Sequence, residues 1–138
     1  MKIERMGIAH VSEVAELEKL CFSDPWSEKS VTSELDNELA LWLVAVEDSR
    51  VAGYVGSQTV AGETDMMNIA VSEDHRRQGI ANALITRLIE ELNHSGAYSL
   101  SLEVRASNIS AIFSLFLLAA FLRDFLLFAS SISCLLLR

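Results

Sequence analysis

The chain has 138 residues, enough for one domain with a sizeable core. Its formal net charge is -8, with 19 acidic against 11 basic residues, so charge alone would not draw it to nucleic acid or to an anionic membrane surface. Two cysteines, Cys21 and Cys134, are too few for a disulfide framework, and the histidines lack the spacing of a metal site. The first residues contain no apolar run typical of a signal peptide, so we expect a cytoplasmic protein without a metal.

The first half of the chain is expected to contain one strand, then two helices, then three strands. Hydrophobic residues recur at intervals of three and four after His10, which predicts an amphipathic helix. The sole proline lies in the next segment and indicates a loop, and Ser27 is a suitable N-cap for a second helix. The expected elements are a strand over residues 2–6, helices over 10–22 and from Ser27 to about Asp36, and strands over 41–47, 51–60 and 63–71.

The segment that follows contains the clearest helix of the chain. A polar and basic loop over residues 72–78 leads into a helix over 79–93, whose leucines and isoleucines form a buried stripe. Gly96 is a plausible end signal for that helix. Residues 98–104 alternate strictly between apolar and polar side chains, which predicts a strand with Glu103 on its non-core face.

This order of elements, β-α-α-β-β-β-α-β, predicts an α/β fold with a mixed sheet and helices on both faces. The strand, helix and strand between Met66 and Val104 indicate a crossover and therefore parallel pairing. Four large side chains are expected to be core residues: Trp42, Tyr54, Met66 and Met67.

The composition changes abruptly from Ile112. Residues 113–137 are nearly all Phe, Leu, Ala, Ser and Ile, so we divide the chain into a domain over 1–112 and an atypical apolar segment over 113–138. Arg123 and Asp124 fall in the middle of this segment, where each would cost roughly 2.5–3.5 kcal/mol on insertion into a bilayer. We therefore expect no membrane span.

A candidate anion site lies where residues 68–71 end and Gly79 opens the long helix. The first N–H groups of a helix are unpaired and lie at the positive end of its dipole, which suits a pyrophosphate. Arg76 and Arg77 add positive charge, and Ala81 keeps the first turn small. A solvated basic loop before an ordinary helix would have the same spacing, and the spacing alone leaves both interpretations open.

Four segments carry a resemblance to a known family. Arg-x-x-Gly-x-Ala, from Arg76 to Ala81, resembles the acetyl-CoA pyrophosphate motif of the GNAT superfamily of N-acetyltransferases. Residues 68–71 resemble its central strand. Pro-Trp-Ser-Glu at residues 25–28 and Leu-Glu-Val-Arg-Ala-Ser-Asn at residues 102–108 are similar to the RimI group, the ribosomal-protein-alanine N-acetyltransferases. The likeness runs from about Ile3 to Ile112.

The resemblance implies the GNAT fold and transfer of an acetyl group from acetyl-CoA to a protein N-terminal α-amine. The substrate would be the N-terminal alanine of a small-subunit ribosomal protein. Glu103 matches the glutamate that acts as general base, although a surface strand glutamate would look the same. The implied acetyl-CoA-binding residues are Ile69, Ala70, Val71, Arg76, Arg77, Gln78, Gly79, Ile80, Ala81, Asn82 and Asn108.

Two residues that match the family, Asn108 and Trp26, have alternative interpretations. Asn108 could be a helix N-cap as well as a cofactor contact. Pro25 and Trp26 match the loop that helps to form the peptide cleft of the family, but Trp26 could instead be a buried anchor.

The apolar segment departs from the family pattern. Relatives continue with a helix that carries a tyrosine, the general acid for the departing CoA thiolate, and then with a closing hairpin. Leu115 stands at the tyrosine position, so an acyl-CoA-binding module with weak or no turnover is the alternative function. An altered or missing hairpin would leave an open sheet edge, so we expect a monomer or weak self-association. An abrupt switch of this kind is typical of a reading-frame change, a hypothesis that the intact mass would test.

Overall fold

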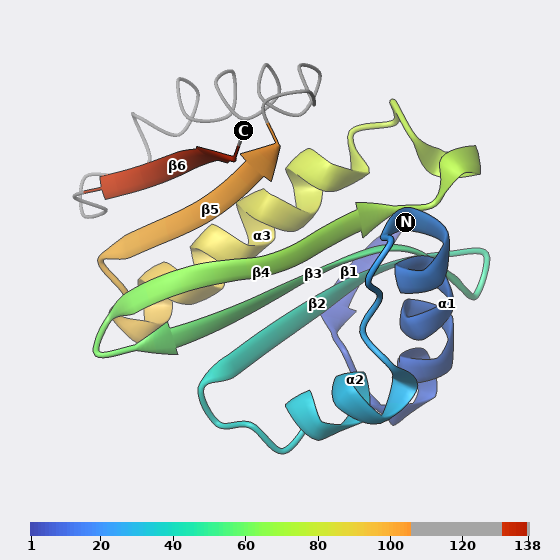
Figure 1. The fold of residues 1–138 in the computed structure, drawn as a ribbon, viewed down its shortest axis with the longest axis horizontal. Coiled ribbons are helices and arrows are strands. Elements are labelled where there is room, and N and C mark those ends of the chain that lie inside the picture. The colour runs from blue at the N-terminus through green and yellow to red at the C-terminus, as the bar shows by residue number, and fades with distance from the viewer. Residues whose placement is uncertain (106–130, 138) are drawn as a thin grey trace.

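The computed structural model describes the backbone of residues 1–105 and 131–137 and the side chains of residues 1–102. The predicted order of elements is confirmed as far as β5, and one further strand is added at the end (Figure 1). The elements are β1 (Lys2–Arg5), a 3-10 turn η1 (Ile8–His10), α1 (Val11–Cys21), α2 (Glu28–Glu34), β2 (Ala40–Glu47), β3 (Arg50–Val60), β4 (Glu63–Val71), a 3-10 turn η2 (Glu73–His75), α3 (Ile80–Ser95), β5 (Ser99–Arg105) and β6 (Ser131–Leu137).

The helix boundaries follow the local signals in the sequence. The side chain of Ser27 caps α2, because its Oγ accepts a hydrogen bond from the N–H of Ser30 at 3.1 Å. Gly96 ends α3 with a φ of 83°, a left-handed conformation that glycine adopts without a steric penalty. Both predictions are confirmed. The loop before α3 differs only in that it contains η2.

The strands form one mixed sheet in the order β1-β2-β3-β4-β5-β6. The first four strands pair antiparallel, whereas β4 pairs with β5 in parallel. Helix α3 makes the crossover between these two strands, as the sequence pattern predicts. The mixed sheet is therefore confirmed.

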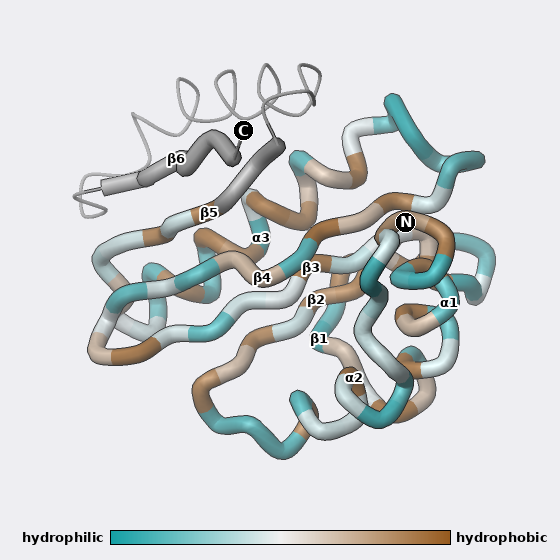
Figure 2. Tube along the Cα trace, in the orientation of Figure 1, coloured by the Kyte–Doolittle hydropathy of each residue, from teal (hydrophilic) through white to brown (hydrophobic). Residues whose placement is uncertain are grey.

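Helices cover both faces of the sheet and enclose two apolar clusters. On one face, α3 packs through Leu84 and Leu88 against Leu43 and Val55 of the central strands. On the other face, α1 and α2 pack over a cluster that includes Trp42 and Tyr54, both expected core residues. Figure 2 shows why α3 fits this place, since hydrophobic and hydrophilic stretches alternate along it.

A β-bulge interrupts the pairing of β3 with β4. Gly56 lies opposite Asn68 and Ser57 lies opposite Met66, so Met67 is an extra residue on β4. Met66 packs against the α3 cluster as expected, but Met67 is 36% exposed and its assignment to the core is wrong. Side chains of a strand alternate between the two faces of the sheet, and the bulge interrupts this alternation at Met67.

Strand β6 covers the edge of β5. The two strands pair in parallel, with Ser99 opposite Ser131 and Arg105 opposite Leu137. The expected open edge at β5 is therefore paired along the whole strand. The boundary between residues 112 and 113 lies outside the described residues and stays a prediction. Within the described part of the chain, no helix is long and apolar enough to cross a membrane.

We expect Gly56→Ala to destabilise the fold. A Cβ at Gly56 would lie 2.6 Å from Cε2 of Trp42, the residue opposite on β2, so the indole would have to move. Overpacking of this kind costs about 1–3 kcal/mol of the free energy of unfolding, which denaturant titration would measure. Gly7→Ala is the control, because its Cβ would meet only His10 Nδ1 at 4.0 Å. A Gly56→Ala variant as stable as the control would contradict this packing.

Candidate functional site

Strands β4 and β5 are paired only at their N-terminal ends. The register runs from Glu63 opposite Ser99 to Asp65 opposite Ser101 and then stops. Figure 1 shows the two strands diverging toward their C-terminal ends. From Met66 to Val71, β4 is paired with β3 alone among the described strands, so its other edge is not covered by a described strand. Ligands of α/β sheets bind at such carboxyl ends.

The N-terminus of α3 lies beyond the end of β4. Gly79 is the N-cap residue with a φ of 79°, and no described side chain caps the helix. The N–H groups of Ile80, Ala81 and Asn82 have no partner within the helix, because they belong to its first turn. A Cβ at Gly79 would meet no described atom within 4 Å, so this backbone borders open space. The arrangement suits an anion.

The loop between β4 and α3 is braced by its own side chains. Arg76 Nε donates to the carbonyl of Val71 at 3.3 Å, and Gln78 Nε2 donates to the carbonyl of Asp74 at 3.2 Å. His75 connects the start of the loop to the end of β2, since its Nδ1 lies 2.6 Å from Ser72 Oγ and its Nε2 lies 3.7 Å from Glu47 Oε2. These contacts hold the loop in one shape before any ligand arrives.

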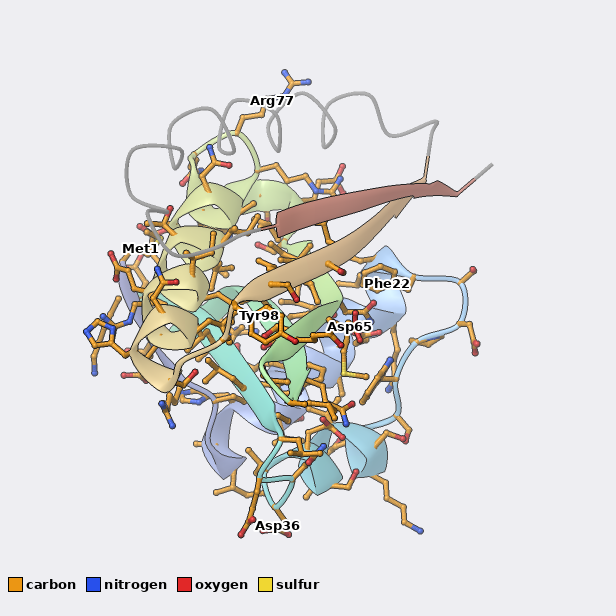
Figure 3. All side chains as sticks on the ribbon, turned by 90° about the vertical axis from the view of Figure 1, so that its left-hand side faces the viewer. Met1, Phe22, Asp36, Asp65, Arg77 and Tyr98 are labelled. Carbon is orange, nitrogen blue, oxygen red and sulfur yellow. The ribbon has the colours of Figure 1, made fainter. Side chains whose placement is uncertain are left out.

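Arg77 lies exposed in this loop. Its backbone has a φ of 62°, a left-handed conformation that is strained for a residue with a Cβ. The side chain extends away from the body of the molecule (Figure 3). It is thus available to a solvent-borne anion near the start of α3.

The predicted cofactor residues before β5 therefore lie in one continuous region. Residues 69–71 form the end of β4 that pairs with β3 but not with β5, residues 76–78 form the braced loop, and residues 79–82 open α3. The sequence resemblance selected them by motif, and the structure places them at one end of the sheet. Their contact with acetyl-CoA stays a prediction.

A buried carboxylate that the sequence analysis did not single out lies on the other face of the sheet. Glu18 of α1 is 0% exposed and accepts hydrogen bonds from Tyr54 and Asn68 through Oε1 and from the N–H of Trp26 through Oε2. Its position was a usable signal, because Glu18 follows Val14 by four residues and so falls on the apolar stripe of α1. An acidic residue on such a stripe requires partners.

The Trp26 side chain packs against Trp42 in the structure. It is half-buried, and its ring lies 5.4 Å from that of Trp42, which in turn stacks on Tyr54 at 5.7 Å. Pro25 beside it is exposed. Trp26 thus packs on the aromatic cluster without being fully buried, and the part that Pro25 and Trp26 play in binding a peptide stays a prediction.

Glu103 lies on the part of β5 that is no longer paired with β4. It stands two residues beyond Ser101, the last β5 residue in register with β4, and opposite Leu135 of β6. Its backbone is thus at the level where the two strands diverge. Asn108 and Leu115 lie outside the described residues, so their predicted roles are untested. Among residues 1–102, no group of three or more potential ligands could hold a metal ion.

Two known proteins with similar sequences carry the same name. The chain is 40% identical over 96 residues to the ribosomal protein bS18-alanine N-acetyltransferase of Escherichia coli (strain K12), covering 70% of this chain and 64% of that protein. It is 34% identical over 107 residues to a putative enzyme of the same name from Bacillus subtilis (strain 168), covering 77% and 71%. The chain thus spans about two thirds of the length of these curated relatives.

Solved structures with the same fold include a close and a distant group. The crystal structure of the ribosomal-protein-S18-alanine N-acetyltransferase from Escherichia coli matches with a TM-score of 0.77 at 34% identity, covering 85% of this chain and 75% of that one. The PaiA N-acetyltransferase from Thermoplasma acidophilum, solved in complex with coenzyme A, matches with a TM-score of 0.72 at 18% identity, covering 85% and 87%. The second likeness shows the fold alone.

A profile of the acetyltransferase (GNAT) family matches residues 11–113, which include the end of β4 that does not pair with β5, the braced loop and α3. The chain therefore belongs to the GNAT family of acetyltransferases.

Proposed function

We propose that this chain transfers an acetyl group from acetyl-CoA to the N-terminal α-amine of a protein. Its substrate would be the N-terminal alanine of a small-subunit ribosomal protein, in the cytoplasm. The observation that carries the proposal is the 40% identity to an enzyme named for that reaction, over a segment that includes the candidate site. The family that the chain belongs to is defined by acetyl transfer.

Acetyl-CoA would bind along the unpaired edge of β4 and at the start of α3. The free N–H groups of Ile80, Ala81 and Asn82 would hold the pyrophosphate, together with the guanidinium groups of Arg76 and Arg77. The pairing of β4 with β5 ends at Asp65, so the edge of β4 over Ile69 to Val71 can pair with the pantetheine arm, except at the carbonyl of Val71, which accepts from Arg76 Nε. An N–H of that edge directed at the thioester carbonyl would stabilise the negative charge that develops there.

Glu103 would remove a proton from the amine. An N-terminal amine has an ordinary pKa of about 7.7–8.0, so most of it is protonated at pH 7 and cannot attack a thioester. A carboxylate on β5 beside the diverging strands could take this proton directly or through one water. The neutral amine then attacks the carbonyl carbon, the C–S bond breaks, and the CoA thiolate leaves. A thiol has an ordinary pKa of about 8.5, so the thiolate can leave without a strong acid at the Leu115 position.

We expect the chain to acetylate an alanine-initiated peptide and Glu103→Gln to lose most of this activity. The amide cannot accept the proton, and loss of a general base typically costs about 10²–10⁴-fold in rate. Mass spectrometry would detect the gain of one acetyl group on the peptide. An acetyl-CoA binding measurement on the same samples serves as control.

Two outcomes would contradict the proposal. Cofactor binding without any acetylation would support an acyl-CoA-binding module in place of an enzyme. Full activity in Glu103→Gln would remove Glu103 from the mechanism.

A pair of glycine variants tests the cofactor site. Gly79 and Gly96 cap the two ends of α3, have φ values of 79° and 83°, and would direct a Cβ toward no described atom within 4 Å. Alanine at either position should therefore destabilise the fold by a similar amount, about 1 kcal/mol, because the left-handed conformation is the same. Thermal unfolding would measure it.

Only Gly79→Ala should weaken the binding of coenzyme A. A methyl group there would stand beside the N–H groups proposed for the pyrophosphate, whereas Gly96 lies at the far end of a 16-residue helix. We expect a loss of about tenfold or more in affinity by calorimetry, equivalent to about 1.4 kcal/mol. Equal affinities in the two variants would place the pyrophosphate elsewhere.

A further inference from the structure

Glu18 is a buried acidic residue that the proposed mechanism does not use. It is 0% exposed and lies among the apolar side chains that α1 packs against the sheet. Removing a carboxylate from water is strongly unfavourable unless hydrogen bonds compensate for it. The structure must therefore supply donors at this point, and the identity of those donors indicates what the residue does.

Three donors converge on the two oxygens of Glu18. Asn68 Nδ2 lies 2.7 Å from Oε1, and the hydroxyl of Tyr54 donates to the same oxygen. The backbone N–H of Trp26 donates to Oε2 at 3.0 Å. Burial, and then the hydrogen bond and charge of Glu18, raise the pKa of the Tyr54 hydroxyl, so it stays a donor. A carboxylate only accepts, which suits three donors.

These donors come from segments that are far apart in the sequence. Trp26 lies in the loop between α1 and α2, and Asn68 lies on β4 directly after the bulge at Met67. The bulge sets the direction of Asn68. Met66, before it, packs with the α3 cluster, as do Ile69 and Val71 after it, while Ala70 packs in the cluster of the opposite face. The extra residue thus turns Asn68 toward α1 and Glu18.

We propose that Glu18 is a positioning residue that fixes the Trp26 loop to β4, next to the bulge of that strand. This inference rests on the proposed function, in which that loop holds the peptide and that strand holds acetyl-CoA. One oxygen binds the loop and the other binds the strand, so the carboxylate sets the distance between amine and thioester. Rates of such reactions depend steeply on this distance.

Glu18 does not act as the general base. Its oxygens already accept from three donors, and its side chain is closed off from solvent by α1, β3 and the loop before α2. A base must reach the amine or a water bound to it. Glu18 therefore acts through Trp26 and Asn68, without touching either substrate.

The test is the steady-state kinetics of Glu18→Met with an alanine-initiated peptide. Methionine has a similar length and no strong acceptor, so the loop and the strand lose their common partner. We expect the KM for the peptide to rise about tenfold or more, with the KM for acetyl-CoA within about twofold of the wild type. None of the three donors to Glu18 is a residue proposed to bind the cofactor. Glu18→Gln keeps one acceptor and should restore part of the peptide KM.

Glu13→Met is the matched control. Glu13 is also on α1 and also accepts from a distant segment, from Arg50 Nε at 2.8 Å and from the N–H of Val51 at 3.1 Å. These partners belong to the start of β3, outside the candidate site. We expect this variant to keep the wild-type KM for the peptide and the wild-type KM for acetyl-CoA. A peptide KM that is unchanged in Glu18→Met, or that rises equally in the control, would overturn the proposal.

A second readout does not depend on activity. The N–H of Trp26 should exchange its hydrogen faster in Glu18→Met than in the wild type, because its acceptor is gone. An unchanged exchange rate of the Trp26 N–H would refute the proposed link between Glu18 and the loop, even in an inactive sample. If Glu18→Met does not fold, Asn68→Ala removes the strand side of the contact and should raise the peptide KM alone. A wild type without acetylation would instead count against the proposed function.

Discussion

Backbone pairing between β4 and β5 stops at Asp65 and Ser101, and the candidate site depends on this early end. Had the strands stayed paired to Val71 and Arg105, the peptide groups of β4 would all be satisfied within the sheet. Because the pairing stops, β4 has one edge held by β3 and one edge open to a ligand. The start of α3 adds unpaired N–H groups just beyond that edge, and the loop between them is held by hydrogen bonds of its own.

The bulge at Met67 divides β4 into two halves with different partners. Without the extra residue, Met66 and Asn68 would point to the same face. With it, Met66 packs under α3 and Asn68 reaches Glu18 on the opposite face. One inserted residue therefore brings a polar side chain into the cluster beneath α1, and the buried carboxylate has a partner on the strand as well as in the loop.

Much of the fold could be predicted from local patterns. The apolar period of α3, the N-cap Ser27 and the left-handed Gly96 specify helices and their ends by contacts within a few residues. The bulge could not be predicted, since Met66 and Met67 are both apolar and only the register with Gly56 and Ser57 distinguishes them. The apolar stripe of α1 marks Glu18 as buried, but its hydrogen-bond partners could not be predicted, because they are 8, 36 and 50 residues away. The motif in residues 76–81 predicts the cofactor segment. The early end of the pairing between β4 and β5 could not be predicted, because it depends on how whole strands pair.

The spatial order of the strands is the same as their order along the chain. During synthesis, each strand therefore emerges next to a partner that has already been made, and the backbone pairing of the antiparallel half is complete at Val71, although α3 must still cover one of its faces. The segment proposed to hold the cofactor, residues 69–82, directly follows that half. Its backbone can thus be made while the last strands are still on the ribosome, and β6 is the last strand to join the sheet.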